Sequence, residues 1–157
     1  MERKIFIELP KIVDSILNPM QMTQTKTDLY HVYGAGIKPV ALVTGMTGQD
    51  GSYMCELLLE KGYEVHGTFR RASNPNTKRI SQIITQVHTH LMDLADASSI
   101  TRVISEVKPE LIFNLAAQSD VRAAYDIPLY TGDVTGLGFT RILEAAKMFC
   151  PDRKSVV

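Results

Sequence analysis

The feature that most constrains this chain is a glycine-rich turn between an apolar run and a helical pattern. Residues 40–44 are apolar and rich in β-branched side chains, and Gly45, Gly48 and Gly51 follow at intervals of three. A helix that begins directly after a buried strand aims its free N–H groups, and the positive end of its dipole, beyond the carboxyl end of that strand. The segment therefore predicts a phosphate-binding turn of the kind that holds dinucleotides.

Each glycine of the turn has an expected role. Gly45 permits the tight turn, Gly48 lets the backbone approach a pyrophosphate, and Gly51 lets the helix pack closely on the sheet. Glycines at this spacing also occur in ordinary loops. The flanking strand and helix patterns supply the context that the dinucleotide-binding interpretation requires.

Strands and helices are expected to alternate along the rest of the chain. Apolar runs predict strands at residues 63–69, 87–92 and 110–115. Helical spacing predicts one helix from the glycine turn to residue 61 and two more at residues 98–107 and 134–149. Residues 79–86 are expected to form a short helix, residues 120–130 a polar loop, and Gly136 and Gly138 sites of close helix packing. This order predicts an α/β fold, a Rossmann-like, doubly wound parallel sheet with its ligand at the carboxyl ends of the strands.

Composition and charge limit the classes of function. The 157 residues are 45% hydrophobic, which suits one globular domain with a core. The formal net charge is zero and no basic run is longer than Arg70-Arg71, so neither nucleic acid nor a membrane surface is an expected partner. Cys55 and Cys150 lie far apart and outside any Cys/His cluster, so we expect buried reduced thiols and no metal site. Without a membrane-spanning run or a signal-peptide core, the expected location is the cytoplasm.

The end of the second strand bears on the choice of cofactor. An NAD-binding unit usually places an acidic residue about twenty residues after the third glycine, where it binds the ribose hydroxyls. Arg70 and Arg71 stand there instead. The planar donors of arginine suit a 2′-phosphate, so NADP is predicted over NAD. The alternative is a pair of solvated surface arginines.

Two further strand ends are candidate cofactor contacts. Asp93 follows the third strand, beside the expected place of the adenine, and its carboxylate is suited to accept a hydrogen bond from an exocyclic amine. In the alternative, Asp93 or, better, Asp96 caps the next helix. Ala116 and Ala117 follow the fourth strand, and such small residues let a nicotinamide approach the backbone or let a helix pack tightly on the sheet.

These motifs together resemble those of the extended short-chain dehydrogenases that act on nucleotide sugars, and most of all the GDP-mannose 4,6-dehydratase family. The resemblance covers residues 39–151. It is carried by residues 44–53 (TGMTGQDGSY), residues 57–67 (LLLEKGYEVHG), the pair Arg70-Arg71 and residues 114–119 (NLAAQS). The tripeptide Gln49-Asp50-Gly51 is the most telling, because sugar epimerases usually carry other residues there.

The resemblance implies a set of NADP contacts and GDP-mannose as the small-molecule substrate of the full-length protein. The implied contacts are Gly45, Met46, Thr47, Gly48, Gln49, Asp50, Gly51, Arg70, Arg71, Ala72, Ser73, Asp93, Leu94, Leu115, Ala116, Ala117, Gln118, Ser119 and Tyr130. The chain departs from the family pattern at residues 120–122 and at Thr135, which flank the substrate region.

The resemblance also implies chemistry that this chain does not carry. The family uses a Ser or Thr with a glutamate after the next strand, then a Tyr-x-x-x-Lys pair, to convert GDP-mannose into GDP-4-keto-6-deoxymannose with loss of water through an internal NADP hydride cycle. No Tyr-x-x-x-Lys occurs here, so no catalytic residue is predicted and the chain as given is expected to be an inactive part of a lyase. Residues 72–78 are implied to reach a neighbouring subunit in a homo-oligomer.

Three regions are expected along the chain. Residues 1–38 form an irregular extension, residues 39–151 the NADP-binding part of an incomplete Rossmann-like domain, and residues 152–157 a non-native tail that departs from the family pattern. The chain is thus expected to belong to a longer protein with later strands and a substrate domain. Two alternatives stay open: another NADP-linked nucleotide-sugar epimerase or reductase, and a non-catalytic NADP-binding module.

Overall fold

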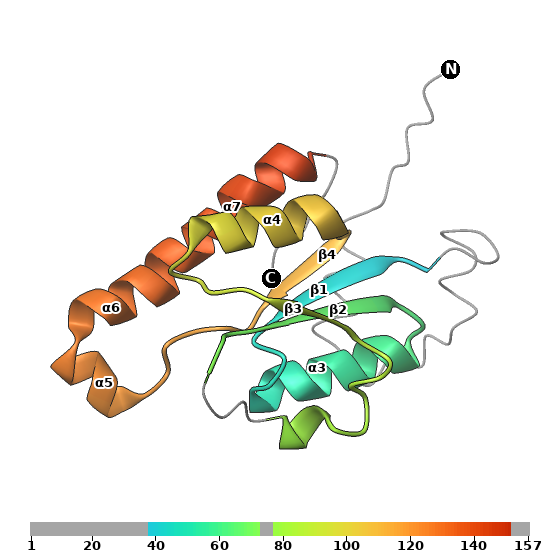
Figure 1. The fold of residues 1–157 in the computed structure, drawn as a ribbon, viewed down its shortest axis with the longest axis horizontal. Helices are drawn as coiled ribbons and strands as arrows, with labels where there is room; N and C mark the ends of the chain where they lie inside the picture. Colours follow the sequence, from blue (N-terminus) through green and yellow to red (C-terminus); the bar gives the residue numbers. More distant parts are fainter. Residues whose placement is uncertain (1–37, 73–76, 152–157) are drawn as a thin grey trace, which may run out of the picture.

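A four-stranded parallel sheet forms the centre of the computed structural model, which describes residues 38–72 and 77–151 (Figure 1). The strands are β1 (Val40–Thr44), β2 (Glu64–Phe69), β3 (His88–Leu91) and β4 (Leu111–Asn114), in the order β3-β2-β1-β4. All neighbouring strands run parallel, as predicted. The expected tail, and the expected extension up to residue 37, lie outside the described residues.

Helices cover both faces of the sheet. On one face lie α3 (Gln49–Glu60) and the 3-10 helix η2 (Lys78–Ile80), and on the other α4 (Ala97–Val107) packs against α7 (Gly138–Phe149) (Figure 1). Because side chains alternate along a strand, Ala41 and Val43 enter the core on the α3 side and Leu42 enters the core under α4 and α7. All three are fully buried. The predicted α/β fold with two covered faces is confirmed.

The ends of two helices follow the capping rules. Asp96 is the N-cap of α4, as predicted, and its carboxylate accepts hydrogen bonds from the N–H groups of Ser98 and Ser99 at 3.1 and 3.2 Å. Gly62 follows α3 with a φ of +88°, which glycine adopts readily at a helix C-terminus.

Two predictions of local structure are wrong. Residues 79–86 contain only the end of η2 and a series of turns. Residues 120–130 are not a loop, because α5 (Val121–Asp126) and the start of α6 (Pro128–Gly132) occupy them. The Asp120 carboxylate caps α5 by accepting a hydrogen bond from the Ala123 N–H at 2.7 Å, and Pro128 suits the first position of α6.

The predicted long helix at residues 134–149 is divided in two. A π-helical segment, η3 (Asp133–Leu137), precedes α7. A Cβ on Gly138 would lie 2.8 Å from the Cβ of Leu94, whereas a Cβ on Gly136 would meet nothing within 4 Å. Close packing is therefore confirmed for Gly138 and wrong for Gly136.

The structure also bears on the thiols and on membrane insertion. Among the described residues, Cys55 and Cys150 form no disulfide and both are buried, as expected. Burial, with a smaller effect of the Glu56 charge, raises the pKa of the Cys55 thiol to about 12. In the described part of the chain, every helix is too short or too polar to cross a membrane.

Candidate functional site

The glycine turn between β1 and α3 is packed so closely that two of its positions require glycine. Gly45 has a φ of +70°, in the left-handed region, and a Cβ there would lie 2.9 Å from the Cα of Ala116. A Cβ on Gly51 would overlap the carbonyl oxygen of Gly45. The roles predicted for Gly45 in the tight turn and for Gly51 in close helix packing are confirmed.

The start of α3 has the geometry of an anion-binding site. Its N-cap is Gly48, and no side chain of the described residues caps its first turn. N–H groups in the first turn of an α-helix have no partner within the helix, and they carry the positive end of the helix dipole. The first turn of α3 lines a cavity at the carboxyl ends of the strands, through Gln49, Asp50 and Gly51. The turn can therefore offer backbone donors to a phosphate.

Thr44, the last residue of β1, connects this turn to the loop after β4. Its hydroxyl donates a hydrogen bond to Oδ1 of Asn114 at 2.7 Å and accepts one from the Ala116 N–H at 3.1 Å. Thr44 is fully buried, so water does not compete for either bond. Thr44 was not predicted as a site residue, although its two hydrogen bonds hold the glycine turn next to the loop after β4.

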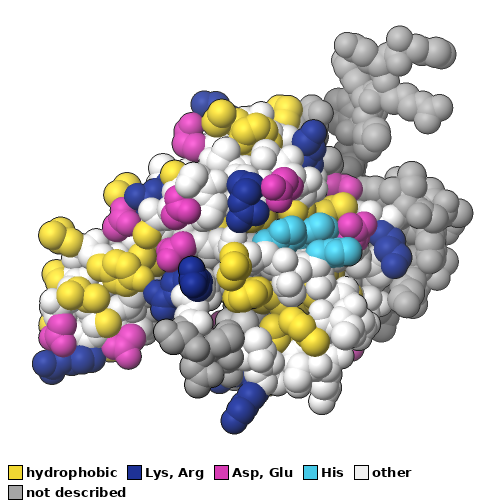
Figure 2. Space-filling view, in the orientation of Figure 1, with side chains coloured by type: hydrophobic (Ala, Val, Ile, Leu, Met, Phe, Trp, Pro, Cys, Tyr) yellow, Lys and Arg dark blue, Asp and Glu magenta, His cyan; other side chains and the backbone are white. Residues whose placement is uncertain are grey.

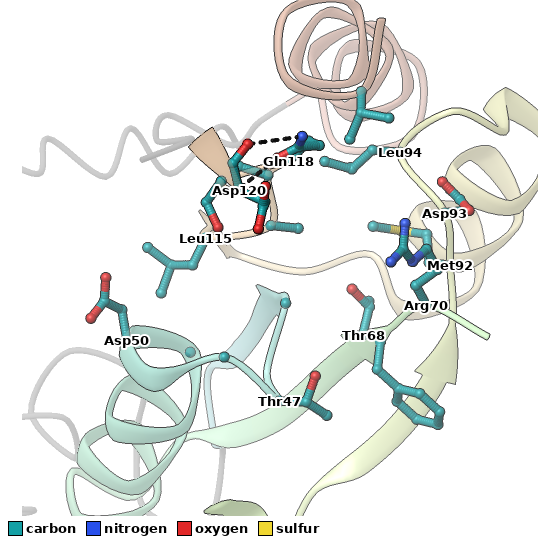
Figure 3. Close-up of a pocket in the computed structure, with 18 of the residues that line it drawn as sticks. Thr47, Asp50, Thr68, Arg70, Met92, Asp93, Leu94, Leu115, Gln118 and Asp120 are labelled. Atoms are coloured by element: carbon teal, nitrogen blue, oxygen red, sulfur yellow. Dashed lines mark hydrogen bonds between the residues drawn. The ribbon is translucent and has the colours of Figure 1, made fainter. Parts of the chain in front are cut away.

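Gln118 orders the loop after β4. Its Nε2 donates to the Asp120 carbonyl oxygen at 3.2 Å, and its Oε1 accepts from the Asp120 N–H at 2.6 Å (Figure 3). The backbone N–H of Gln118 donates to the Thr135 hydroxyl at 3.3 Å, which ties the loop to η3. The side-chain amide is thus engaged within the chain, where it shapes the rim of the cavity.

Arg70 closes the opposite side of the cavity. Its Nη1 donates a hydrogen bond to the hydroxyl of Tyr130 on α6 at 2.8 Å. Figure 3 shows Arg70 near Asp93, across the opening from Asp50 and Leu115. Because a guanidinium carries five N–H donors, the bond to Tyr130 leaves donors for an anionic ligand.

These elements surround a cavity of about 830 Å³ at the carboxyl ends of the strands, within the size range of small-molecule sites. The predicted contacts that line it are Gly45, Thr47, Gly48, Gln49, Asp50, Gly51, Arg70, Asp93, Leu94, Leu115, Ala116, Ala117, Gln118, Ser119 and Tyr130. The structure therefore brings together residues from five separate segments of the sequence.

Other predicted contacts lie elsewhere. The Met46 side chain is fully buried in the core under α3, where it fills the space over Gly67, and its N–H donates to the Thr68 carbonyl oxygen at 3.0 Å. Arg71 and Ala72 are exposed and do not line the cavity. Ser73 lies outside the described residues.

Several residues of the cavity wall were not predicted: Thr68, Phe69, Met92, Asp120, Ala123 and Val134. Thr68, Phe69 and Met92 lie at or next to the carboxyl ends of β2 and β3, so their place at a strand end was the available signal. Ala123 and Val134 offered no such signal, because they belong to α5 and η3, which the sequence did not reveal.

A cofactor contact and a helix cap were the two roles considered for Asp93 and Asp96, and each residue is placed for one of them. Asp96 caps α4. Asp93 lines the cavity, and its Oδ1 accepts a hydrogen bond from the Ala95 N–H at 2.9 Å. A carboxylate has acceptor sites on both oxygens, so Asp93 can still accept a hydrogen bond from a ligand.

A protein-family model described as GDP-mannose 4,6 dehydratase matches residues 42–156. The chain belongs to this family. Its relatives include GDP-mannose 4,6 dehydratase 1 of Arabidopsis thaliana, which is 51% identical over 121 residues, 71% of this chain and 34% of the relative. The GDP-mannose 4,6 dehydratase of Homo sapiens is 49% identical over 116 residues, 69% of this chain and 31% of the relative. The chain thus spans about a third of the length of these family members.

Solved structures share its fold. The UDP-glucose 4-epimerase of Thermus thermophilus, in complex with NAD, matches with a TM-score of 0.62 and 29% identity over 70% of this chain and 34% of its own. The epimerase Mth375 of Methanothermobacter thermautotrophicus matches with a TM-score of 0.65 and 27% identity over 79% of this chain and 35% of its own. The dehydratase family member described here therefore has the Rossmann-like sheet of nucleotide-sugar epimerases.

Proposed function

We propose that this chain is the NADP-binding part of a GDP-mannose 4,6-dehydratase. The observation that carries the proposal is the cavity where the uncapped start of α3, the glycine turn and Arg70 meet. The carboxyl ends of the strands are the general ligand-binding edge of a doubly wound sheet. The N–H groups of α3 are suited to the pyrophosphate of a dinucleotide. Membership of the dehydratase family supports the choice of reaction.

The choice of NADP over NAD rests on Arg70. Residues 69–72 read Phe-Arg-Arg-Ala and include no acid for the 2′-hydroxyl of the ribose. Arg70 lines the cavity, and its bond to Tyr130 restrains the guanidinium there. A restrained planar fork of donors favours a 2′-phosphate. Arg71, outside the cavity wall, contributes less in this proposal.

GDP-mannose is the proposed substrate of the longer protein. Identity to the two dehydratases is 49–51%, against 27–29% to the two epimerase structures. In the proposed reaction the sugar loses water through an internal hydride cycle, which is the chemistry that NADP supplies when bound. The residues described here hold and orient the dinucleotide. The 157 residues contain no Tyr-x-x-x-Lys, so we propose that this chain alone does not perform the dehydration.

A chimaeric enzyme tests the proposal. In GDP-mannose 4,6 dehydratase 1 of Arabidopsis thaliana, the segment that aligns with this chain is replaced by the matching residues of this chain, and conversion of GDP-mannose to a 4-keto product is measured. We expect conversion by the chimaera and none by the 157-residue chain alone. A folded chimaera that binds NADPH but leaves GDP-mannose unchanged would contradict the assignment of the reaction. A folded chimaera that binds no NADPH would contradict the assignment of the cofactor.

A further inference from the structure

Three of the chain's four histidines gather on the edge of the sheet, away from the dinucleotide cavity. His66 belongs to β2, and His88 and His90 belong to β3. Glu64, the first residue of β2, completes the group. Figure 2 shows the histidine side chains together over these strands, with acidic side chains beside them. We call these four residues the histidine cluster.

Strand geometry places the whole histidine cluster on one face. Side chains two residues apart on a strand share a face, which pairs Glu64 with His66 and His88 with His90. His66 lies opposite His88 in the parallel register of β2 and β3. On its other side His66 lies opposite Leu42 of β1. The histidines therefore lie on the same face of the sheet as Leu42, which is the face covered by α4 and α7.

Two distances in the histidine cluster are close to those between the ligands of one metal ion. Nε2 of His66 lies 3.1 Å from Oε1 of Glu64, and Nε2 of His88 lies 3.8 Å from the same oxygen. The three ligand atoms all lie within 4.8 Å of one another. Ligands bound tetrahedrally to zinc at about 2.0–2.1 Å are ~3.4 Å apart. The His66 and His88 rings are stacked, with centroids 4.7 Å apart and planes at 27°, so these side chains must rotate for both Nε2 lone pairs to meet at one ion.

We propose that Glu64, His66 and His88 bind a single divalent transition-metal ion, with zinc as the reference ion. Two imidazoles and one carboxylate are a ligand set that suits zinc and leaves a fourth position for water. The side chains of Glu64 and His88 are 44% and 62% exposed, so an ion can reach the site from solvent. His66 is only 13% exposed and fixes the inner side of the site.

His90 contacts the ring nitrogen of His66 that does not face Glu64. Nδ1 of His66 lies 2.9 Å from Nε2 of His90. A metal-ligating histidine usually donates its second ring N–H to an acceptor, which fixes its tautomer and orientation. With the ion on Nε2, His66 carries its proton on Nδ1 and donates it to Nε2 of His90. His90 is therefore a positioning residue.

The histidine cluster has a different hydrogen-bond pattern without an ion. His90 then donates from Nε2–H to Nδ1 of His66, and His66 donates from Nε2–H to the Glu64 carboxylate. Metal binding reverses the tautomers of both rings without a net loss of protons from either. This reversal distinguishes a bound ion from a purely structural chain of hydrogen bonds.

Zinc titration of the tag-free 157-residue chain tests the proposal. A chromophoric chelator competes for Zn²⁺ with the wild type, with His88→Asn and Glu64→Gln, and with His31→Asn, which removes the histidine outside the cluster as a matched control. We expect one ion per chain, an affinity at least about tenfold lower in the two cluster variants, and no change in His31→Asn. Zinc should also raise the melting temperature of the wild type and not that of His88→Asn.

Two results would overturn the proposal: no saturable zinc binding by the wild type, or unchanged binding by a folded His88→Asn variant. Circular dichroism without zinc checks that the variants are folded. Should a variant fail to fold, nitrogen-15 spectra of the wild-type histidine rings still decide. They must show the metal-bound Nε2 and protonated Nδ1 pattern at His66 when zinc is added, and unchanged His66 signals contradict the site.

Discussion

The guanidinium of Arg70 donates a 2.8 Å hydrogen bond to the hydroxyl of Tyr130, a residue 60 positions later in the chain. This bond joins the carboxyl end of β2 to α6 across the cavity. The bond gives a surface arginine a defined position. Arg70 was predicted as a cofactor contact from its place at the end of a strand, and Tyr130 from the resemblance to the dehydratase family. The contact makes Arg70, rather than its neighbour Arg71, the residue that the cofactor proposal depends on.

Replacing Arg70 by alanine should weaken NADPH binding far more than NADH binding. A hydrogen bond to a charged group contributes about 1.5–3 kcal/mol, so we expect a loss of roughly tenfold to a hundredfold for NADPH. Arg71→Ala should have a smaller effect, because Arg71 does not line the cavity. Arg79→Ala, an exposed arginine on η2, serves as the control for a lost surface charge. Isothermal titration of each variant with both nucleotides measures the difference, and equal losses for NADPH and NADH would assign Arg70 to the surface.

Gly45→Ala should lower the free energy of unfolding. Alanine at a φ of +70° is strained by about 1–3 kcal/mol, and its Cβ would lie 2.9 Å from the Cα of Ala116. Gly136→Ala is the matched control, because a Cβ there meets nothing within 4 Å. In a helix this control should gain about 0.5–1 kcal/mol. Urea unfolding followed by circular dichroism measures both, and a Gly45→Ala variant as stable as the wild type would show that the turn is not held as described.

Cys55 should resist alkylation in the native chain at pH 8. Burial, followed by the effect of the Glu56 charge, raises its pKa from 9.0 to about 12, so the thiol stays neutral well above that pH. The thiolate is the reactive form, and the side chain is fully buried. Mass spectrometry after iodoacetamide treatment should find Cys55 unmodified in buffer and modified in urea. Equal modification in both conditions would contradict the burial of Cys55.

Much of the fold was predictable because its signals are local. The apolar run before Gly45 and the glycine spacing identify β1 and the start of α3. Asp96 indicates the start of α4, because aspartate is a favoured N-cap residue. The two short helices at residues 121–126 and 128–132 were missed, because neither is long enough to show helical periodicity. The π-helical segment at residues 133–137 was missed for a different reason: its residues also suit an α-helix.

In the site, too, residues within local motifs could be predicted, and residues whose position depends on a neighbouring strand could not. Residues of the glycine turn and of the NLAAQS loop were found from their motifs. Met46 was misplaced because its orientation depends on Gly67 of the neighbouring strand, which leaves room for the methionine side chain in the core. The histidine cluster was missed because only the pairing of β2 with β3 sets His66 opposite His88. Strand register of this kind is not readable from a single sequence.

The most direct test of the proposed function is the affinity of the 157-residue chain for NADPH and for NADH, measured by isothermal titration in the same buffer. In the proposed function, the cavity between the start of α3 and Arg70 is a dinucleotide site that favours the 2′-phosphate. We predict saturable binding of one NADPH per chain, about tenfold or more tighter than NADH. Binding of NADH as tight as that of NADPH, or no saturable binding of either nucleotide to the folded chain, would contradict it.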